Sequence, residues 1–248
     1  MKEDPSEYGE REARVDLVCA LRSAERLGLA EGVCNHCSLA VPGRPGQFLI
    51  NPLGLHWSEV LPGDLVIVDA DGRHISGRHS VEPTAFFIHG RIHNASPRAH
   101  CVLHTHMPHA TALTIVEGGE LAWASQNALR FYGRVAYERA YNGLALDAAE
   151  GDRMAASVRD ADVVFLANHG VIVCGPSVAY AFDDLYYLER ACELQLLGQA
   201  SGRPLKIVPQ EIAAATRAQM DAERQQSELH LAALKRILDK QQPGWRGN

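Results

Sequence analysis

Strand-like and helical segments follow one another in this chain without the regular strand–helix–strand order of a parallel sheet. Runs rich in β-branched and apolar residues occupy positions 38–41, 48–51, 65–70, 101–106, 163–167 and 171–174. Helical patterns occupy much of the first thirty residues and positions 83–95, 177–200 and 210–239. This mixture predicts an α/β protein in layers with much antiparallel pairing. Neither G-x-G-x-x-G nor G-x-x-x-x-G-K-[ST] occurs, so the sequence gives no sign of a nucleotide-binding fold.

Length and charge narrow the class of protein further. The 248 residues contain no repeat and no linker-like stretch, so we expect a single domain over residues 1–248 with a C-terminal helix at about 210–240. The net charge of −6 and the lack of a Lys/Arg block argue against nucleic-acid and anionic-membrane partners. No apolar run approaches the roughly 18 residues of a membrane span. The charged first fourteen residues lack an apolar signal core, which predicts a cytoplasmic location.

The cysteines include one C-x-x-C pair, Cys34 and Cys37, with no second pair to complete a metal or redox site. We therefore expect small, half-buried side chains at both positions.

The segment His104-Thr105-His106 is the strongest chemical signal in the sequence. It closes an apolar strand-like run, and alternate residues of a strand point to the same side, so both imidazoles should face one way. Such a pair needs a third neutral ligand to complete the open set typical of a catalytic divalent metal. His169 is the natural candidate because it also follows an apolar strand-like run, in a tight Asn-His-Gly turn.

Two other features admit structural interpretations as well as functional ones. His89 and His93 lie four residues apart on one face of the helix at 83–95, but no H-E-x-x-H motif is present, and we interpret them as packed histidines. Glu82 precedes the same helix. It is either a partner of the helix dipole or a carboxylate that performs acid–base chemistry beside the metal.

The order of Glu82, His104-Thr105-His106 and His169 resembles that of the class II aldolase/adducin family. The resemblance extends to the segments at 32–38 and 48–54 and covers roughly residues 10–205. It implies a three-layer α/β/α sandwich around a mostly antiparallel sheet and a homotetramer with sites near subunit boundaries. It also implies one Zn²⁺ or Mn²⁺ per subunit on His104, His106 and His169, with Glu82 as the acid/base and Asn35 in the substrate-binding loop.

Departures from the family pattern bear on the substrate. Phosphate-handling members have Gly where this chain has Cys34, and paired Ser where it has Ser80-Val81. Val81 cannot donate to a phosphate oxygen, and Cys34 removes a glycine that lets backbone N–H groups approach an anion. A small unphosphorylated anion is therefore favoured. Arg78 and Arg130 are candidate partners for its carboxylate.

Three functional hypotheses follow from the resemblance. The first is a metal-dependent decarboxylase of a hydroxy-aromatic or hydroxypyridine carboxylate, because the pattern is similar to that of the family member acting on 3-hydroxy-2-methylpyridine-4,5-dicarboxylate. The second is an aldolase that cleaves a keto-sugar or sugar phosphate. The third is a non-enzymatic, adducin-like assembly module. The first two are both carbon–carbon lyases, so the reaction class is better defined than the substrate.

Overall fold

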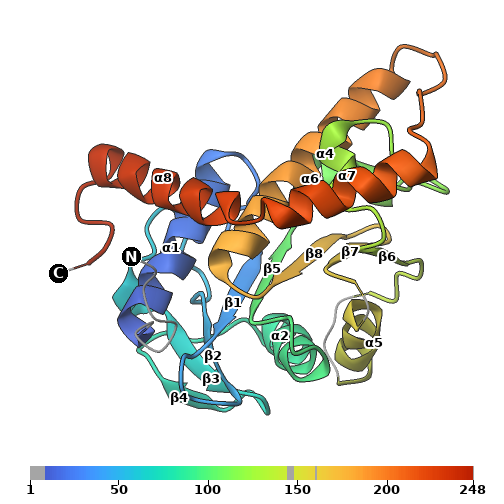
Figure 1. Ribbon diagram of the computed structural model, residues 1–248. Helices are drawn as coiled ribbons and strands as arrows, with labels where there is room; N and C mark the ends of the chain where they lie inside the picture. Colours follow the sequence, from blue (N-terminus) through green and yellow to red (C-terminus); the bar gives the residue numbers. More distant parts are fainter. Residues whose placement is uncertain (1–8, 144–147, 160, 248) are drawn as a thin grey trace.

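A computed structural model describes residues 9–143, 148–159 and 161–247 of the chain (Figure 1). The N-terminal residues 1–8, which contributed to the predicted cytoplasmic location, lie outside this set. The helices are α1 (Glu10–Arg26), α2 (Pro83–Ala95), α3 (Pro108–Thr114), α4 (Gln126–Leu129), α5 (Ala148–Val158), α6 (Val178–Gln199), α7 (Gln210–Ala222) and α8 (Gln226–Gln241). The strands are β1 (His36–Ala40), β2 (Gln47–Ile50), β3 (Val66–Asp69), β4 (His74–Ser76), β5 (Cys101–Thr105), β6 (Val135–Glu138), β7 (Val163–Leu166) and β8 (Gly170–Gly175).

All eight strands form one sheet in the order β4-β3-β2-β1-β5-β8-β7-β6. Neighbouring strands are antiparallel except for β6 and β7, which run parallel. Helices α2 and α5 cover one face, while α1, α6 and α8 lie on the other (Figure 1). The predicted α/β/α sandwich around a mostly antiparallel sheet is confirmed.

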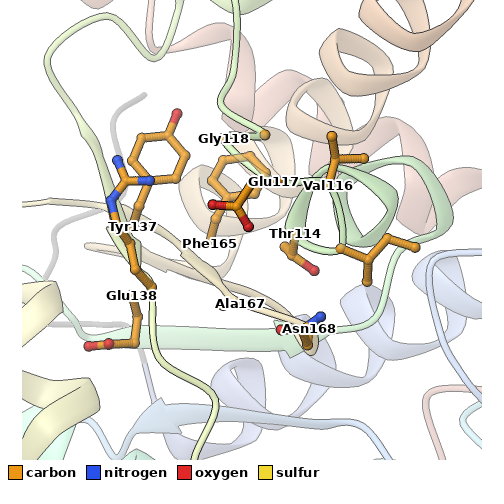
Figure 2. Close-up of a pocket in the computed structure, with 12 residues that line it drawn as sticks. Thr114, Val116, Glu117, Gly118, Tyr137, Glu138, Phe165, Ala167 and Asn168 are labelled. Atoms are coloured by element: carbon orange, nitrogen blue, oxygen red, sulfur yellow. The ribbon is translucent and has the colours of Figure 1, made fainter.

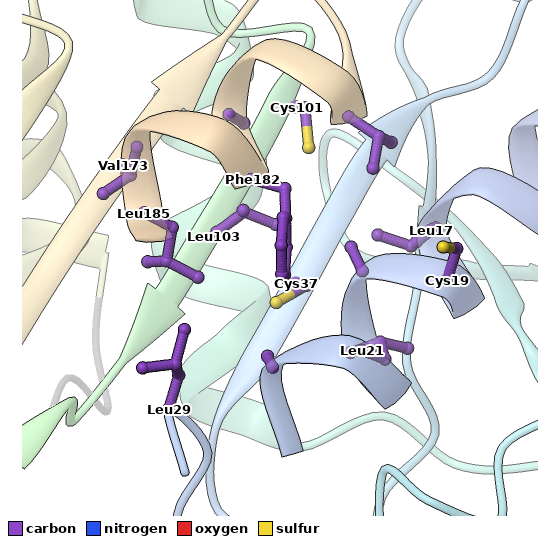
Figure 3. Packing of buried hydrophobic residues seen from close by; sticks show 14 of the residues in the cluster. Leu17, Cys19, Leu21, Leu29, Cys37, Cys101, Leu103, Val173, Phe182 and Leu185 are labelled. Carbon is purple, nitrogen blue, oxygen red and sulfur yellow. The ribbon is translucent and has the colours of Figure 1, made fainter. Parts of the chain in front are cut away.

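The larger apolar core lies between the sheet and helices α1 and α6. Leu17 and Leu21 are one turn apart on α1 and pack there with Leu103 of β5 and Phe182 of α6 (Figure 3). Cys37 also points into this core, and its burial raises the pKa of its thiol. Cys34, in contrast, is exposed. Because one thiol is in the core and the other faces solvent, the expectation of two half-buried side chains is wrong, but the pair forms no shared site.

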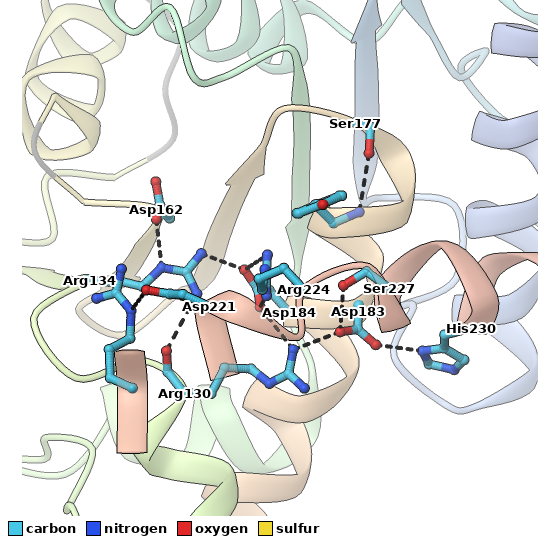
Figure 4. Close-up of polar contacts among 12 residues, drawn as sticks. Arg130, Arg134, Asp162, Ser177, Asp183, Asp184, Asp221, Arg224, Ser227 and His230 are labelled. Atoms are coloured by element: carbon cyan, nitrogen blue, oxygen red, sulfur yellow. Dashed lines mark hydrogen bonds and ion pairs between the residues drawn. The ribbon is translucent and has the colours of Figure 1, made fainter. Parts of the chain in front are cut away.

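The predicted C-terminal helix at 210–240 is wrong in one respect, because the structure has two helices, α7 and α8, with a turn at 223–225 between them. Arg224 in that turn reaches the carboxylate of Asp184 on α6, which is completely buried (Figure 4). The turn contains neither Gly nor Pro, so nothing local in the sequence marks it.

Asp184 also accepts a hydrogen bond from Arg134 at 2.6 Å, so that one buried carboxylate is held by two guanidinium groups. This network attaches the C-terminal helices to the body of the protein. Among the described residues, no helix combines the length and the apolarity needed to cross a membrane.

Replacing Asp184 with Ala should lower the free energy of unfolding by about 3–5 kcal/mol, because the partly buried guanidinium of Arg224 loses its carboxylate partner and that of Arg134 keeps only Asp162. Chemical denaturation monitored by circular dichroism measures this difference. Asp221→Ala is the matched control, since Asp221 pairs with Arg217 at a largely exposed position and should cost less than about 1 kcal/mol. Equal losses in the two variants would contradict the assigned role of Asp184.

Candidate metal centre

The two histidines of the His-Thr-His segment lie at the end of β5, in the middle of the sheet. β5 is hydrogen-bonded to β1 on one side and to β8 on the other. His104 and His106 point to the face covered by α2, whereas Thr105 between them is fully buried. Their ring centroids are 5.1 Å apart, so the period-two spacing brings them together as predicted.

His169 joins them from the turn between β7 and β8. Asn168 adopts a left-handed conformation with φ of 56° to make this turn, and its N–H donates to the carbonyl of Thr114. A Cβ atom on Gly170 would lie only 2.6 Å from the carbonyl oxygen of Thr105, so glycine is required where β8 begins against the end of β5. The close approach that glycine permits places His169 over His106.

The three imidazoles together form a compact nitrogen cluster. One ligand atom from each of His104, His106 and His169 lies within 4.8 Å of the other two. The ring centroid of His169 is 4.8 Å from the ring centroid of His104 and 4.8 Å from that of His106. Three neutral nitrogen ligands on one side leave room for further ligands on the other, as in catalytic zinc sites.

Hydrogen bonds on the far side of two rings direct their remaining nitrogens toward the cluster. His104 donates from Nδ1 to the carbonyl oxygen of Val171 at 3.0 Å, which leaves Nε2 with its lone pair. His106 bonds through Nδ1 to the carboxylate of Glu31, and its Nε2 is buried and has no hydrogen-bond partner in the part of the chain that the structure describes. A carboxylate behind a ligating imidazole orients the ring and raises its basicity. The residues present therefore fit a divalent metal.

Glu82 lies beside this cluster and begins helix α2. Its Oε2 accepts from the N–H of Ala85 at 2.9 Å and from the hydroxyl of Thr84, so the helix-start interpretation of this residue holds. The same oxygen is 3.9 Å from Nε2 of His36, a β1 residue that pairs with His104 across the strands. The ring centroids of His36 and His104 are 4.8 Å apart. The carboxylate thus caps the helix and lies on the far side of His36 from His104.

Burial favours the neutral form of two imidazoles in this region, those of His36 and His104. Loss of hydration lowers the pKa of His36 to about 4, and that of His104 falls well below its ordinary value for the same reason. A neutral imidazole is the form that binds a metal.

Asn35 lies in the loop before β1, as predicted for the substrate-binding loop. Its side-chain oxygen accepts from the N–H of Glu31 at 2.9 Å and lies 3.5 Å from the N–H of His106. Its amide nitrogen is buried and has no partner among the described residues. The loop thus holds an unused hydrogen-bond donor close to the metal ligands.

The two arginines predicted to bind the substrate are engaged elsewhere. Arg78 is 73% exposed and bonds to Asp64 at 2.5 Å. Arg130 bonds to Asp183 at 2.7 Å and lies over the ring of Tyr187, within the network of Figure 4. Neither guanidinium contacts the histidine cluster in the described part of the chain, so the prediction that they anchor the substrate gains no support from their contacts.

A cavity of about 170 Å³ opens beside the turn that carries His169 (Figure 2). Asn168 of that turn lines it, together with Thr114, Tyr137 and Phe165. It gives solvent a path to the outer side of the His169 turn.

Sequence reasoning missed two contributors to the site. Glu31 is 75 positions away from His106, and no motif links them. His36, which no motif singles out, lies between Glu82 and His104. The period-two pattern of strand β1 could have shown that His36 and Ser38 share a face. Which residues contact that face is known only from the register of β1 against its neighbouring strands.

Comparisons with known proteins agree with this geometry. The profile of the Class II Aldolase and Adducin N-terminal domain matches residues 15–196. Decarboxylase NovR of Streptomyces niveus is 31% identical over 226 residues, which cover 89% of this chain and 83% of that protein. The crystal structure of an aldolase II superfamily protein from Pseudomonas syringae matches with a TM-score of 0.89 at 35% identity, covering 96% of both chains. The L-fuculose 1-phosphate aldolase of Glaciozyma antarctica matches with a TM-score of 0.83 at 25% identity, covering 93% of this chain and 91% of that one.

Removal of His106 should lower zinc affinity by more than tenfold, because one of three nitrogen ligands is lost. Glu31→Gln should lower it by roughly 10- to 100-fold, since the carboxylate that orients His106 is lost while its size is kept. Competition titration against a chromophoric chelator measures both affinities. His109→Ala is the control, because His109 bonds to Glu189 outside the cluster. Unchanged affinity in His106→Ala would contradict the metal centre.

The buried histidines should make the metal-free protein less stable in acid. Burial lowers the pKa of His93 to about 3 and that of His89 well below its ordinary value. In the unfolded chain they take up protons below about pH 6.5, which the folded chain resists, so stability is lost as the pH falls from there toward 3. Each such histidine should lower the free energy of unfolding by about 2 kcal/mol between pH 7 and pH 5.

Urea unfolding at the two pH values measures this loss. The decrease should be about 2 kcal/mol smaller in His93→Gln than in the wild type, whereas His100→Gln, which removes an exposed imidazole, should keep the full decrease. An identical pH dependence in the wild type and His93→Gln would contradict the assignment.

Proposed function

This chain belongs to the class II aldolase and adducin family, and from that premise we propose that it is a divalent-metal-dependent carbon–carbon lyase. We favour a decarboxylase that acts on a small, unphosphorylated hydroxy-aromatic or hydroxypyridine carboxylate. The observation that carries the proposal is the cluster of His104, His106 and His169. The carboxylate of Glu82 lies near this cluster, with His36 between them. A scaffold protein would need neither the three converging nitrogens nor a carboxylate beside them.

The charges around the cluster support an unphosphorylated substrate. Glu31 and Glu82 both approach the histidines, and the two arginines considered as anchors are paired elsewhere. A phosphate dianion would therefore meet two carboxylates and no free guanidinium in the described part of the chain. A single carboxylate held by the metal and by the amide nitrogen of Asn35 fits this environment better.

The bound ion, Zn²⁺ or Mn²⁺ on His104, His106 and His169, would act as a Lewis acid that stabilises negative charge developing on a substrate oxygen. In a decarboxylation the bond between the ring carbon and the carboxylate breaks, CO₂ leaves, and the electron pair stays on the ring carbon. That carbon must then receive one proton. Contacts with Ala85 and Thr84 engage Oε2 of Glu82, so we assign the proton transfer to Oε1.

The alternative is an aldolase, which the likeness to L-fuculose 1-phosphate aldolase supports. In that reaction the same carboxylate would move a proton during cleavage between two sugar carbons. The purified, metal-loaded protein distinguishes the two when it is given aromatic and pyridine carboxylates and keto-sugar phosphates. Release of CO₂ supports the decarboxylase, release of an aldehyde supports the aldolase, and neither product from any of these substrates would contradict the lyase.

We also propose that the protein forms a homotetramer. The C-terminal helices leave large apolar side chains exposed, among them Leu197 of α6, Ile212 of α7 and Leu229 of α8. Their burial between subunits would account for an apolar surface that one chain leaves open.

Glu82→Gln should lower kcat by roughly 10²–10⁴-fold, the usual worth of general acid–base catalysis, with a modest change in KM. The amide keeps the size of the side chain and the helix cap, so the variant separates proton transfer from packing. Steady-state kinetics with the substrate that the screen identifies, together with metal analysis, measure the effect. Thr84→Val is the control that removes a partner of Oε2 and keeps the carboxylate; kcat near the wild-type value in Glu82→Gln would contradict the assignment.

A further inference from the structure

A chain of hydrogen-bonded polar side chains is buried between β1 and α2. His36 and Ser38 point from β1 to the α2 face, where His89 and His93 stand one turn apart. Nδ1 of His36 lies 2.8 Å from Nε2 of His89, and Nδ1 of His89 lies 2.5 Å from the hydroxyl of Ser38. That hydroxyl is 2.7 Å from Nε2 of His93, whose Nδ1 is 2.6 Å from the carbonyl oxygen of Ala99.

The carbonyl at one end fixes the direction of every bond in this chain. A carbonyl oxygen only accepts, so Nδ1 of His93 carries a hydrogen and, in the neutral ring, Nε2 accepts. The Ser38 hydroxyl must then donate to His93 and accept from Nδ1 of His89. Nε2 of His89 is in turn an acceptor, so Nδ1 of His36 donates to it. The burial that lowers the pKa values of His89 and His93 supports their neutral form.

The other end of the chain faces the candidate metal centre. Nε2 of His36 is 3.9 Å from Oε2 of Glu82, which is too long for a hydrogen bond, so no proton is shared between the two atoms. Oε2 already accepts from Ala85 and Thr84 and is a lone-pair acceptor. Nε2 of His36 is therefore left as an acceptor beside Glu82, with no hydrogen-bond partner among the described residues.

We propose that Nε2 of His36 accepts the hydrogen of a hydroxyl group of the substrate beside Glu82, and that His89, Ser38 and His93 are positioning residues that hold His36 in its acceptor tautomer. This rests on the proposed function, because it places the substrate beside the three histidines. It narrows the substrate class to a carboxylate with a hydroxyl group that keeps its hydrogen. A phosphate or carboxylate oxygen at this position would meet only lone pairs and negative charge.

Nuclear magnetic resonance of the zinc-loaded protein with ¹⁵N-labelled histidine reads the tautomers directly. His36, assigned in uniformly ¹³C,¹⁵N-labelled wild type by through-bond correlation to its own backbone, should carry hydrogen on Nδ1 and none on Nε2, and His89 and His93 should have the same tautomer. Hydrogen on Nε2 of His36 would overturn the proposal. The wild-type spectrum alone decides this, so the test does not depend on whether a variant folds.

Ser38→Val tests the positioning role, because valine fills the space of the hydroxyl without its hydrogen bonds and leaves no room for water. His89 can then donate from Nε2, and His36 should shift its hydrogen to Nε2, on the side of Glu82. An unchanged His36 tautomer in this variant would overturn the positioning role of the chain. A merely structural role for Ser38 would alter stability without altering the tautomer.

Glycolate and methoxyacetate are matched probes for the hydroxyl, because both offer a carboxylate and a second oxygen but only glycolate can donate. Calorimetry on the zinc-loaded wild type should show glycolate binding tighter by roughly tenfold, the worth of one hydrogen bond. The ratio of the affinity for glycolate to that for methoxyacetate should approach one in His36→Phe. It should stay unchanged in His74→Phe, which alters an exposed histidine of β4.

A ratio that His36→Phe leaves unchanged, or a failure of the zinc-loaded wild type to bind either acid, would overturn the proposal. Zinc content, measured separately, reports on the metal centre. A protein without zinc would defeat the proposed function, and the tautomer spectrum of that protein would still decide this inference.

Discussion

The antiparallel register of strand β5 is the constraint on which the site depends. β5 is paired on both sides, and this register sets His104 opposite His36 on β1 and opposite Ile172 on β8. A shift of one residue would turn His104 into the apolar core and Thr105 toward α2. Gly170 adds the second constraint, because only a residue without a side chain lets β8 begin so close to Thr105 and His106. The histidine cluster is thus a consequence of strand pairing more than of any single loop.

Neutral imidazoles are the second theme of the structure. His36, His89 and His104 are buried and His93 is half-buried, and loss of hydration lowers the pKa of each. Burying a polar ring is tolerated only when its nitrogens find partners. Two arrangements bear on that need here: the hydrogen-bonded chain that ends on Ala99, and the histidine cluster, where Nε2 of His106 has no partner among the described residues. The first arrangement leaves one acceptor, Nε2 of His36, for a donor from outside the chain, whereas the nitrogens of the second could hold a divalent metal.

The sequence predicted the parts that depend on local periodicity. Spacing predicts that His104 and His106 face the same way, and the structure confirms it. Helical patterns likewise predict α2, which begins at Pro83, and α6, which follows Ser177. Strand β6 and helix α5 were not predicted, because their segments are short or weakly patterned. The break between α7 and α8 depends on a buried ion pair 40 positions away in the sequence. The partners of His106 and His36 likewise depend on contacts between distant segments, which no local pattern encodes.

If the proposed function is right, three histidines, and no cysteine, hold one divalent ion. X-ray absorption spectroscopy of the zinc-reconstituted protein tests this most directly, because it counts nitrogen and sulfur neighbours of the metal without need of a substrate. We expect one zinc per chain with imidazole nitrogens at about 2.0–2.1 Å and no sulfur. Sulfur at about 2.3 Å, as the exposed thiol of Cys34 would give, or a protein that retains no zinc, would contradict it.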